Sequence, residues 1–385
     1  MGQAHIEPAL LQDHLKGRYI SLDVLRGLTI ALMVVVNTPG SWSAVYAPFH
    51  HAAWHGFTIT DWVFPSFLFV VGNAMSFSLT KTISQGNSLF LKKVFKRTIL
   101  IFFIGLFLTA YPFFRIVDGE MVPFDFSKIR IMGVLQRIAL CYGIAALVIF
   151  YFRPKGAVIY SLVALFGYWA IMYFFGESSD PYSLTGNAAI KLDLIILGAD
   201  NMYKGEGIPF DPEGLLSTLP ATVNVIAGYF VGRYLQQSGA NTRTAVKLVI
   251  IGLVLVIIAY AWDLLFPINK KIWTSSYVML TVGLSTLALA FLVYLIEICR
   301  IYKWTYFFEV FGRNPLVLYA LSGLLIKTMF MISVEGKSLN GYFYEDVLLS
   351  FLSDKNASLF FALVYMLLIW VIGYLMDKRK IYLKV

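Results

Sequence analysis

The sequence is poor in charged residues, which make up 14% of its 385 positions, whereas 59% of the residues are hydrophobic and 16% are aromatic. Soluble domains usually carry about 25% charged residues. The mean hydropathy of +0.73 agrees with this. The composition excludes an ordinary soluble protein and predicts a polytopic membrane protein. Its net charge of +9 is therefore expected to reflect membrane topology, and nucleic acid is not an expected partner.

Cysteine is almost absent, with Cys141 and Cys299 as the two copies. Each lies in or beside an apolar stretch, so neither a disulfide framework nor a redox pair is expected. The first twenty residues lack an uninterrupted apolar segment, and no cleavable signal peptide is expected there. Repeats of fixed period, low-complexity tracts and long linkers are also missing. Residues 1–385 are therefore expected to form one membrane domain.

Ten apolar stretches approach the roughly 20 residues that a helix needs to cross a hydrocarbon layer about 30 Å thick. They lie near residues 21–38, 60–80, 94–112, 131–152, 156–175, 214–235, 246–266, 275–298, 310–332 and 357–376. We therefore predict an all-α integral membrane protein, a bundle of about ten transmembrane helices.

Lysine and arginine gather on alternate connections between these stretches, as in 92–97 and 378–380. Positively charged connections are typical of the cytoplasmic side, so these connections and both termini are predicted to be cytoplasmic. The connection 176–213 instead holds seven acidic residues and two lysines. It is predicted to face outward, either as a cap that faces a substrate or as a disordered loop.

Residues 49–65 concentrate groups that can carry out chemistry: three of the five histidines, two tryptophans and one acid, between two apolar stretches. Imidazole titrates near neutral pH, so this outward segment is a candidate catalytic site. Asp61 begins the next predicted helix, where a carboxylate caps the N-terminus and could also orient an imidazole. The spacing of His51 and His55 would suit two metal ligands, but no second cluster supplies more, so no metal is expected.

Polar residues also interrupt the apolar stretches. Asp23 and Arg26 share a helix face and are expected either to pair at the membrane interface or to serve function. Gln136 and Arg137 lie well inside 131–152, where a guanidinium needs an anion, carbonyl groups or a phosphate-bearing ligand. Arg313 near the cytoplasmic end of 310–332 is a similar case, with a helix start as the structural alternative.

Several motifs, in order along most of the chain, resemble the heparan-α-glucosaminide N-acetyltransferase family. They are Ser21–Gly27, Asn37, His51–Thr58 with Asp61–Pro65, Lys128–Arg137 and Asp211–Leu216. The resemblance implies an enzyme that takes acetyl groups from cytosolic acetyl-CoA and delivers them to the amino group of a glucosamine across the membrane. It also implies that His51 is catalytic and that Asn37 is its partner.

On this basis we assign the remaining polar residues to two sites. Acceptor binding is assigned to Trp54, His55, Asp61, Arg130 and Asp211, and acetyl-CoA binding to Asp23, Arg26, Gln136, Arg137 and Arg313. Two features depart from the animal enzyme, namely a longer connection from Asn37 to His51 and a histidine at position 55 in place of asparagine. The large outward domain of the animal enzyme has no counterpart, so heparan sulfate is not the expected acceptor.

The chemistry sets physical demands that these residues can meet. Acetyl-CoA carries phosphates, so transfer across a bilayer needs a cationic cytoplasmic opening, a polar path and a base at the outer mouth. His51 could act as a general base or as a nucleophile that forms an acetyl-imidazole. Asn37 could donate its amide N–H to the developing oxyanion.

Three other functions remain open from the sequence. They are a transporter of amino sugars or other small solutes, an O-acetyltransferase acting on an envelope glycan, and a non-catalytic membrane subunit. For the enzyme we expect a bacterial inner membrane with the His51 segment in the periplasm. The lipid bilayer, acetyl-CoA and an amino sugar are the expected partners, and a homodimer is left open.

Overall fold

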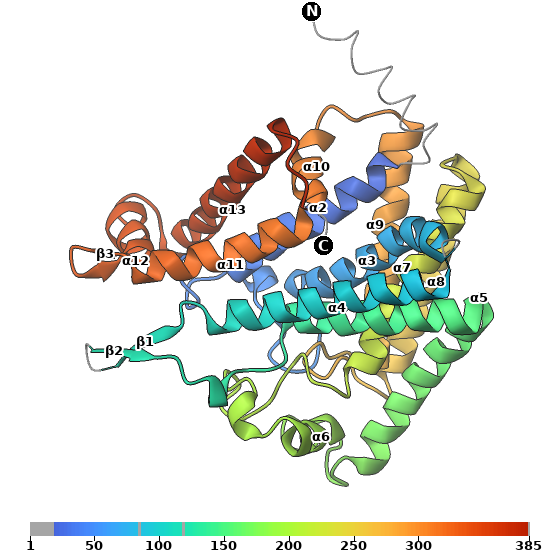
Figure 1. Cartoon of the computed structure of the whole chain (residues 1–385), viewed down its shortest axis with the longest axis horizontal. Helices are drawn as coiled ribbons and strands as arrows, with labels where there is room; N and C mark the ends of the chain where they lie inside the picture. Colours follow the sequence, from blue (N-terminus) through green and yellow to red (C-terminus); the bar gives the residue numbers. More distant parts are fainter. Residues whose placement is uncertain (1–18, 84–85, 118–119, 384–385) are drawn as a thin grey trace, which may run out of the picture.

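Within residues 19–83, 86–117 and 120–383, which the computed structural model describes, the chain is mostly helical and includes two short β-hairpins (Figure 1). The helices are α2 (Ile20–Asn37), α3 (Ile59–Ile83), α4 (Asn87–Ala110), α5 (Val134–Phe175), α6 (Ala188–Ile196), α7 (Thr218–Ser238), α8 (Thr242–Asp263), α9 (Ser275–Leu292), α10 (Thr305–Arg313), α11 (Pro315–Met331), α12 (Leu339–Tyr342) and α13 (Asp354–Lys378). The antiparallel hairpins are β1 (Phe114–Val117) with β2 (Glu120–Pro123), and β3 (Ser333–Val334) with β4 (Lys337–Ser338).

Local sequence explains where several helices begin. The Asn187 side chain accepts the N–H of Ile190 at 2.9 Å before α6, and the Asn241 side chain accepts the N–H of Thr244 at 3.0 Å before α8. Such caps satisfy backbone donors that have no partner inside the first helical turn. These polar residues therefore end the connections and start the apolar helices.

Each of the ten predicted stretches overlaps a helix, but not every one is a separate candidate span. Six helices are long and apolar enough to cross a membrane, and the α10–α11 pair, bent by 83°, would be a seventh. The first half of α4 is too rich in lysine and arginine to qualify, and α5 contains two of the predicted stretches. The helical, multi-pass character is confirmed, whereas ten crossings and cytoplasmic termini stay predictions. Residues 1–18 and 384–385 lie outside the described residues.

A break divides α5 into two arms. Arg153 has a left-handed backbone conformation, with φ 57° and ψ −179°, directly before Pro154. Proline removes a backbone donor and clashes with the preceding turn, so the helix axis changes direction there. Figure 1 shows the change of direction at the right-hand end of α5, between the two predicted stretches 131–152 and 156–175.

Close packing fixes α3 against α7. A Cβ atom at Gly72 would lie 1.8 Å from the carbonyl oxygen of Val225, and one at Gly228 would lie 1.9 Å from the carbonyl oxygen of Phe69. Glycine at both positions lets the two backbones approach, as small residues do between membrane helices. This contact fixes α3, whose first turn carries Asp61.

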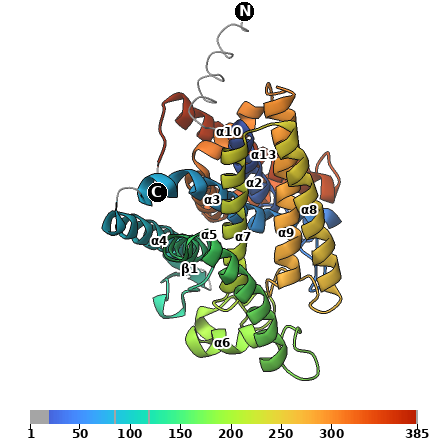
Figure 2. The ribbon, with the colours of Figure 1, turned by 90° about the vertical axis from the view of Figure 1, so that its right-hand side faces the viewer.

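The predicted outward connection 176–213 is folded. It contains α6 and packs a second hydrophobic cluster around Met172, Tyr182, Phe210 and Phe266. Figure 2 shows α6 below the bundle, close to the lower end of α7. The alternative of a disordered loop is therefore wrong, and the segment forms a layer over one end of the bundle.

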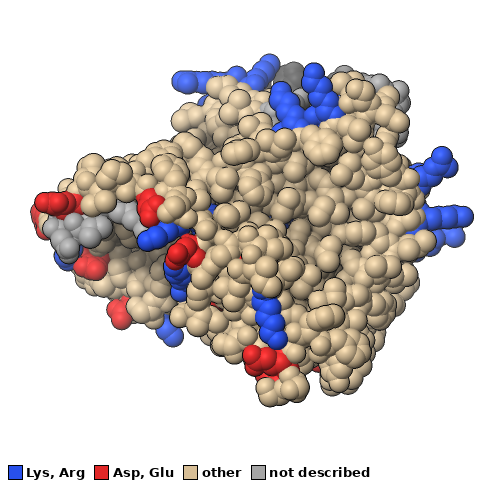
Figure 3. Space-filling view, turned by 60° about the horizontal axis from the view of Figure 1, so that its bottom comes forward, with Lys and Arg blue, Asp and Glu red and all other residues tan. Residues whose placement is uncertain are grey.

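Charged side chains are separated on the surface seen in Figure 3. In this view the top and right edges carry lysine and arginine without acidic side chains, whereas aspartate and glutamate lie at the left and bottom, beside further lysine and arginine side chains. A broad uncharged surface lies between them. This distribution is typical of a protein whose middle is in contact with lipid.

Candidate active site

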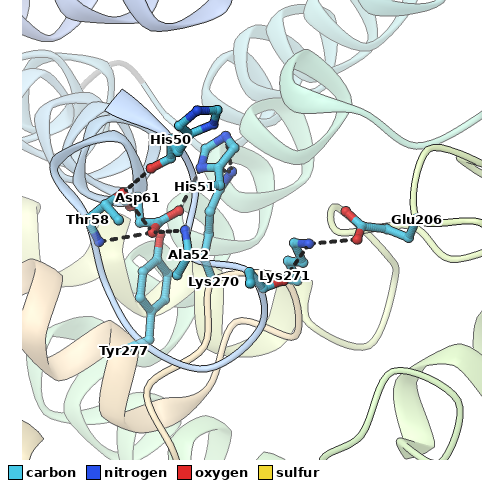
Figure 4. A network of polar contacts seen from close by, with 10 residues as sticks. His50, His51, Ala52, Thr58, Asp61, Glu206, Lys270, Lys271 and Tyr277 are labelled. Atoms are coloured by element: carbon cyan, nitrogen blue, oxygen red, sulfur yellow. Dashed lines mark hydrogen bonds and ion pairs between the residues drawn. The ribbon is translucent and has the colours of Figure 1, made fainter. Parts of the chain in front are cut away.

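The histidine segment is a loop that runs over the start of α3. Asp61 lies in the first turn of α3, and its Oδ2 atom accepts the backbone N–H groups of Thr58 at 3.0 Å and of Ala52 at 3.1 Å. The contact with Thr58 is the backbone half of a capping box, in which an acid at the third helical position reaches back to the N-cap residue. Asp61 thus caps its own helix and fastens the preceding loop to it (Figure 4).

The other oxygen of the same carboxylate holds His51. Asp61 Oδ1 lies 2.6 Å from His51 Nδ1, and the Asp61 side chain is 1% exposed while that of His51 is 39% exposed. The Tyr277 hydroxyl donates to the backbone carbonyl of Asp61 at 2.6 Å. A buried carboxylate that binds Nδ1 fixes the ring orientation and leaves Nε2 for chemistry. The predicted role of Asp61 in orienting an imidazole therefore has a geometric basis.

Lys270 approaches the same ring from the loop between α8 and α9. Its Nζ atom lies 3.1 Å from His51 Nε2 and 3.4 Å from His51 Nδ1. Burial lowers the pKa of Lys270, and the carboxylates of Glu213 and Asp61 oppose that shift. Sequence reasoning missed this residue. The available signal was a pair of lysines, Lys270 and Lys271, on a connection that the charge pattern assigns to the outside.

The segment 176–213 packs directly on the histidine loop. Trp54 donates its ring N–H to the Tyr182 carbonyl at 2.9 Å, and its ring lies 5.7 Å from that of Phe210. Lys271 binds Glu206 at 2.6 Å and the Ala53 carbonyl at 2.9 Å. This folded segment is hereafter called the cap, and it borders the loop that carries His51.

His55 lies farther along the loop and is not part of the His51–Asp61 pair. Its Nδ1 atom lies 3.4 Å from the side-chain nitrogen of Asn269, a buried residue. Burial lowers the pKa of His55, against opposing charges from Asp180 and Asp263. Because the segment is a loop, the helical spacing considered for two metal ligands does not apply.

Arg130, which is partly exposed, binds two buried carboxylates, those of Asp211 and Glu213. Arg130 donates to both oxygens of Asp211, at 3.0 and 2.7 Å, and to Glu213 at 2.7 Å. Burial alone would lower the pKa of Arg130, but the two carboxylates raise it above its ordinary value. The structure therefore joins two predicted acceptor-binding residues in a contact that fastens the cap, and their contact with substrate stays a prediction.

The five residues assigned to acetyl-CoA lie in different places. Arg137 is fully buried beneath the cap, where it donates to the Gly214 carbonyl at 2.8 Å and to the Ser217 hydroxyl. Gln136 is also buried and lies against Gly105 of α4. Neither residue lines the cavity that holds other members of the set.

That cavity has a volume of about 390 Å³ and lies among α2, α3, α4, α5 and the α10–α11 bend. Arg26, Arg97 and Arg313 all line it. Arg26 pairs with Asp23 at 3.4 Å, which is the predicted ion pair, and Arg313 binds Asp377 at 2.6 and 2.7 Å. Among the described residues, the buried Nε atoms of Arg97 and Arg313 have no hydrogen-bond partner. Three arginines thus line this cavity, two of them paired with carboxylates.

Asn37 is the last residue of α2 and is exposed. In the described part of the chain its side chain makes no hydrogen bond, and its predicted partnership with His51 is not visible as a direct contact. The contacts of His51 come from Asp61 and Lys270 instead. The role of Asn37 as the partner of His51 therefore stays a prediction.

Comparisons with a family model and with individual proteins point to the same family. The model of the heparan-alpha-glucosaminide N-acetyltransferase catalytic family matches residues 18–266. Proteins named heparan-alpha-glucosaminide N-acetyltransferase from Mus musculus and Homo sapiens are each 27% identical, over 351 and 368 residues. The alignments cover 77% and 82% of this chain but 52% and 54% of the relatives. The chain thus spans about half the length of the curated relatives it matches.

The Arg130 triad predicts a test of stability. Arg130→Met should lower the free energy of unfolding by about 3–5 kcal/mol, because it leaves two buried carboxylates without their cation. Lys128→Met is the matched control, because Lys128 is 57% exposed and its ion pair with Asp125 is long, at 3.8 Å. Loss of this surface pair should lower the free energy of unfolding by less than about 1 kcal/mol. Denaturant titration in detergent measures both. Equal stability of the two variants would contradict the role of Arg130.

Proposed function

Because the chain belongs to the heparan-alpha-glucosaminide N-acetyltransferase catalytic family, we propose that it is a transmembrane N-acetyltransferase. It takes acetyl from cytosolic acetyl-CoA and transfers it to the amino group of a glucosamine-type sugar on the outer face of the membrane. The activity in the relatives' names belongs to proteins about twice as long. For this chain the activity rests on the site described above.

The observation that carries the proposal is the His51–Asp61 pair at the exposed end of α3. An amine is mostly protonated near neutral pH and must lose a proton to attack a thioester, so the reaction needs a positioned base. Asp61 binds Nδ1 at 2.6 Å, which directs Nε2 toward the substrate. The pair is accessible, since the His51 side chain is 39% exposed.

The reaction balances around Nε2. The protonated amine first loses one proton through Nε2 to solvent. The freed nitrogen then bonds to the acetyl carbon, the carbon–sulfur bond of the thioester breaks, and the second proton passes through Nε2 to the departing sulfur. In the covalent variant Nε2 takes the acetyl group as the thiolate leaves, the free amine then attacks the acetyl-imidazole, and the released Nε2 accepts the amine proton. Asp61 stabilises the imidazolium that forms in either route.

The acceptor is proposed to lie beside the exposed edge of His51, at the border of the cap. Trp54 presents a ring, and His55 a polar edge, along the same loop. Asp61 acts through His51, and Arg130 with Asp211 supports the cap from below. Asn37 is proposed to contact the substrate directly, because no side chain of the described residues holds it.

The arginine cavity is proposed to bind the phosphates of acetyl-CoA. Guanidinium groups pair with phosphate through several donors, and Arg26, Arg97 and Arg313 converge here. The cavity wall includes Phe67, which lies six residues after Asp61 on α3 and hence about 9 Å along the helix axis. The long arm of the donor would pass Phe67 to bring the thioester to His51.

The proposed orientation places the cavity toward the cytoplasm and the His51 loop in the bacterial periplasm. Its support is the charge pattern of the connections, together with the separation of charges seen in Figure 3. The membrane impermeability of acetyl-CoA requires donor and acceptor to approach from opposite faces.

Removing the imidazole tests the activity. His51→Ala should lower kcat for acetyl transfer from labelled acetyl-CoA to glucosamine by about 10²–10⁴-fold, because the base or nucleophile is lost. His50→Ala is the matched control, because the neighbouring His50 is exposed and contributes only its backbone carbonyl, which accepts from the Thr58 hydroxyl, to the described network. It should stay within about threefold of the wild type.

Three outcomes would count against the proposal or redirect it. Full activity in His51→Ala would remove His51 from the mechanism. Uptake of labelled glucosamine by vesicles without acetyl-CoA would favour the transporter. Mass analysis of an acetylated envelope glycan would identify an O-acetyltransferase if the product carries an ester in place of an amide.

Donor binding is tested at the cavity. Arg97→Met should raise the Kd for CoA at least about tenfold, since a charge-assisted hydrogen bond contributes about 1.5–3 kcal/mol. Lys247→Met removes the same charge from an exposed position on α8 and should leave the Kd unchanged. Isothermal titration calorimetry in detergent measures both. Equal Kd values would place the CoA phosphates elsewhere.

Orientation is tested by labelling from outside intact cells. A cysteine at the exposed Ser43, in a Cys299→Ser background, should react with an impermeant maleimide, because the His51 side is proposed to face outward. The exposed native Cys299 lies at the opposite end of the bundle's helices and serves as the control. It should react only after the cells are opened. The reverse pattern would invert the topology.

A further inference from the structure

Two adjacent lysines in the loop between α8 and α9 have different surroundings. Lys271 is bound by Glu206 at 2.6 Å and by the Ala53 carbonyl at 2.9 Å, so its charge fastens the cap. Lys270 lies against the imidazole of His51 instead, 3.1 Å from Nε2. Among the described residues no carboxylate lies within salt-bridge distance of Lys270. Its ammonium group therefore has donors that the fold does not use.

Hydrogen bonds and burial order the backbone turn that carries Lys270. Trp273 donates its backbone N–H to the Lys270 carbonyl at 3.1 Å, and its own side chain is fully buried. Asn269 exchanges hydrogen bonds with Thr274, at 3.0 and 3.1 Å, and its side chain accepts the N–H of Ile272 at 3.1 Å. Trp273 has a φ of 51°, which turns the backbone sharply at this point. The lysine is therefore presented by an ordered turn.

Charged groups of both signs surround the ammonium group of Lys270. Glu213 from the cap and Asp61 from α3 attract its ammonium, whereas Lys271 and Arg137 repel it. Arg130, Lys270 and Arg137 keep the pKa of Glu213 below its ordinary value although burial would raise it. Glu213 is thus a carboxylate that supports the positive charge of Lys270 without binding it directly.

The position of Lys270 matches a demand of the reaction. Attack on a thioester converts the carbonyl oxygen to an oxyanion, and donors aimed at that oxygen lower the barrier. In the covalent route the acetyl carbon bonds to Nε2. In the direct route the acceptor nitrogen, which gives its proton to Nε2, bonds to that carbon. Both routes bring the acetyl oxygen close to Nε2, where the Lys270 ammonium lies 3.1 Å away.

We propose that Lys270 is a catalytic residue whose ammonium group binds the acetyl oxygen and stabilises the tetrahedral oxyanion. This inference rests on the proposed acetyl transfer. Lys270 donates a hydrogen bond and keeps its proton. In the direct route the amine proton passes through Nε2 to the departing sulfur. In the covalent route the thiolate leaves first, and the amine proton passes to Nε2 as that nitrogen is released from the acetyl group.

The first experiment removes the charge and keeps the stem. Lys270→Met should lower kcat by about 10²–10³-fold, the usual loss for one oxyanion donor, with little change in KM. Lys247→Met is the control because it removes a charge from an exposed position on α8, away from the His51 loop and the cap, and its kcat should stay within about threefold of the wild type. Unfolding in detergent and CoA binding show that each variant is folded.

The second experiment restores the charge. Lys270→Cys in a Cys299→Ser background should regain activity on treatment with 2-bromoethylamine, which converts the new cysteine to a lysine analogue. Cys141 is buried and should not react. A role limited to structure would not be rescued in a protein that is already folded, so recovery of kcat identifies the ammonium itself.

The third measurement is the pH dependence of kcat. Because burial lowers the pKa of Lys270, wild-type activity should fall on the alkaline side below the ordinary pKa of lysine, as the ammonium loses its proton. Lys270→Arg stays protonated and should move this fall to higher pH, even if its kcat is reduced. This variant also tests the proposal should Lys270→Met fail to fold.

The outcomes separate the two proposals. Absence of acetyl transfer by the wild-type protein would contradict the proposed function. Transfer by the wild type, with Lys270→Met equal to Lys247→Met, would overturn the role of Lys270 alone. Failure of bromoethylamine to restore kcat, or an alkaline limb that Lys270→Arg does not move, would also overturn it.

Discussion

The buried carboxylate of Asp61 is the contact on which the rest of the site depends. One oxygen accepts backbone N–H groups of the loop and of the helix cap, and the other binds His51. An anion that is 1% exposed is stable only when such partners surround it, so loop, helix and imidazole are held in one arrangement. The close contact of α3 with α7 then fixes this arrangement relative to the bundle.

The same helix links the two halves of the proposed reaction. Its first turn holds His51, and residues from Phe67 to Ala74 line the arginine cavity. In the proposed reaction a charged donor and a polar acceptor would approach the two ends of this segment of α3. The cap completes the acceptor end, because the Arg130 triad and the Lys271–Glu206 pair attach it to the bundle.

Much of this arrangement could be predicted from local patterns, and some could not. The His51–Asp61 pair could be predicted because Asp61 lies ten positions after His51, at the start of the next helix. The Asp23–Arg26 pair could be predicted because both residues lie on one face of one helix. Arg137 was assigned to acetyl-CoA from its position in an apolar stretch, but the structure turns it toward Gly214 and Ser217. Burial in a helix does not indicate which neighbour the side chain meets.

The sequence by itself determined that the chain is helical and apolar enough for a membrane, where most of its long helices lie, and which loop carries three of its histidines. Hydropathy, capping residues and the motif around His51 act over short distances, so they can be read directly. Only the tertiary structure decided which distant charges meet. Lys270 reaches a histidine 219 residues away, and Arg130 reaches Asp211 across 81 residues. Such contacts depend on helix packing and on the turn that presents each side chain, which no local pattern encodes.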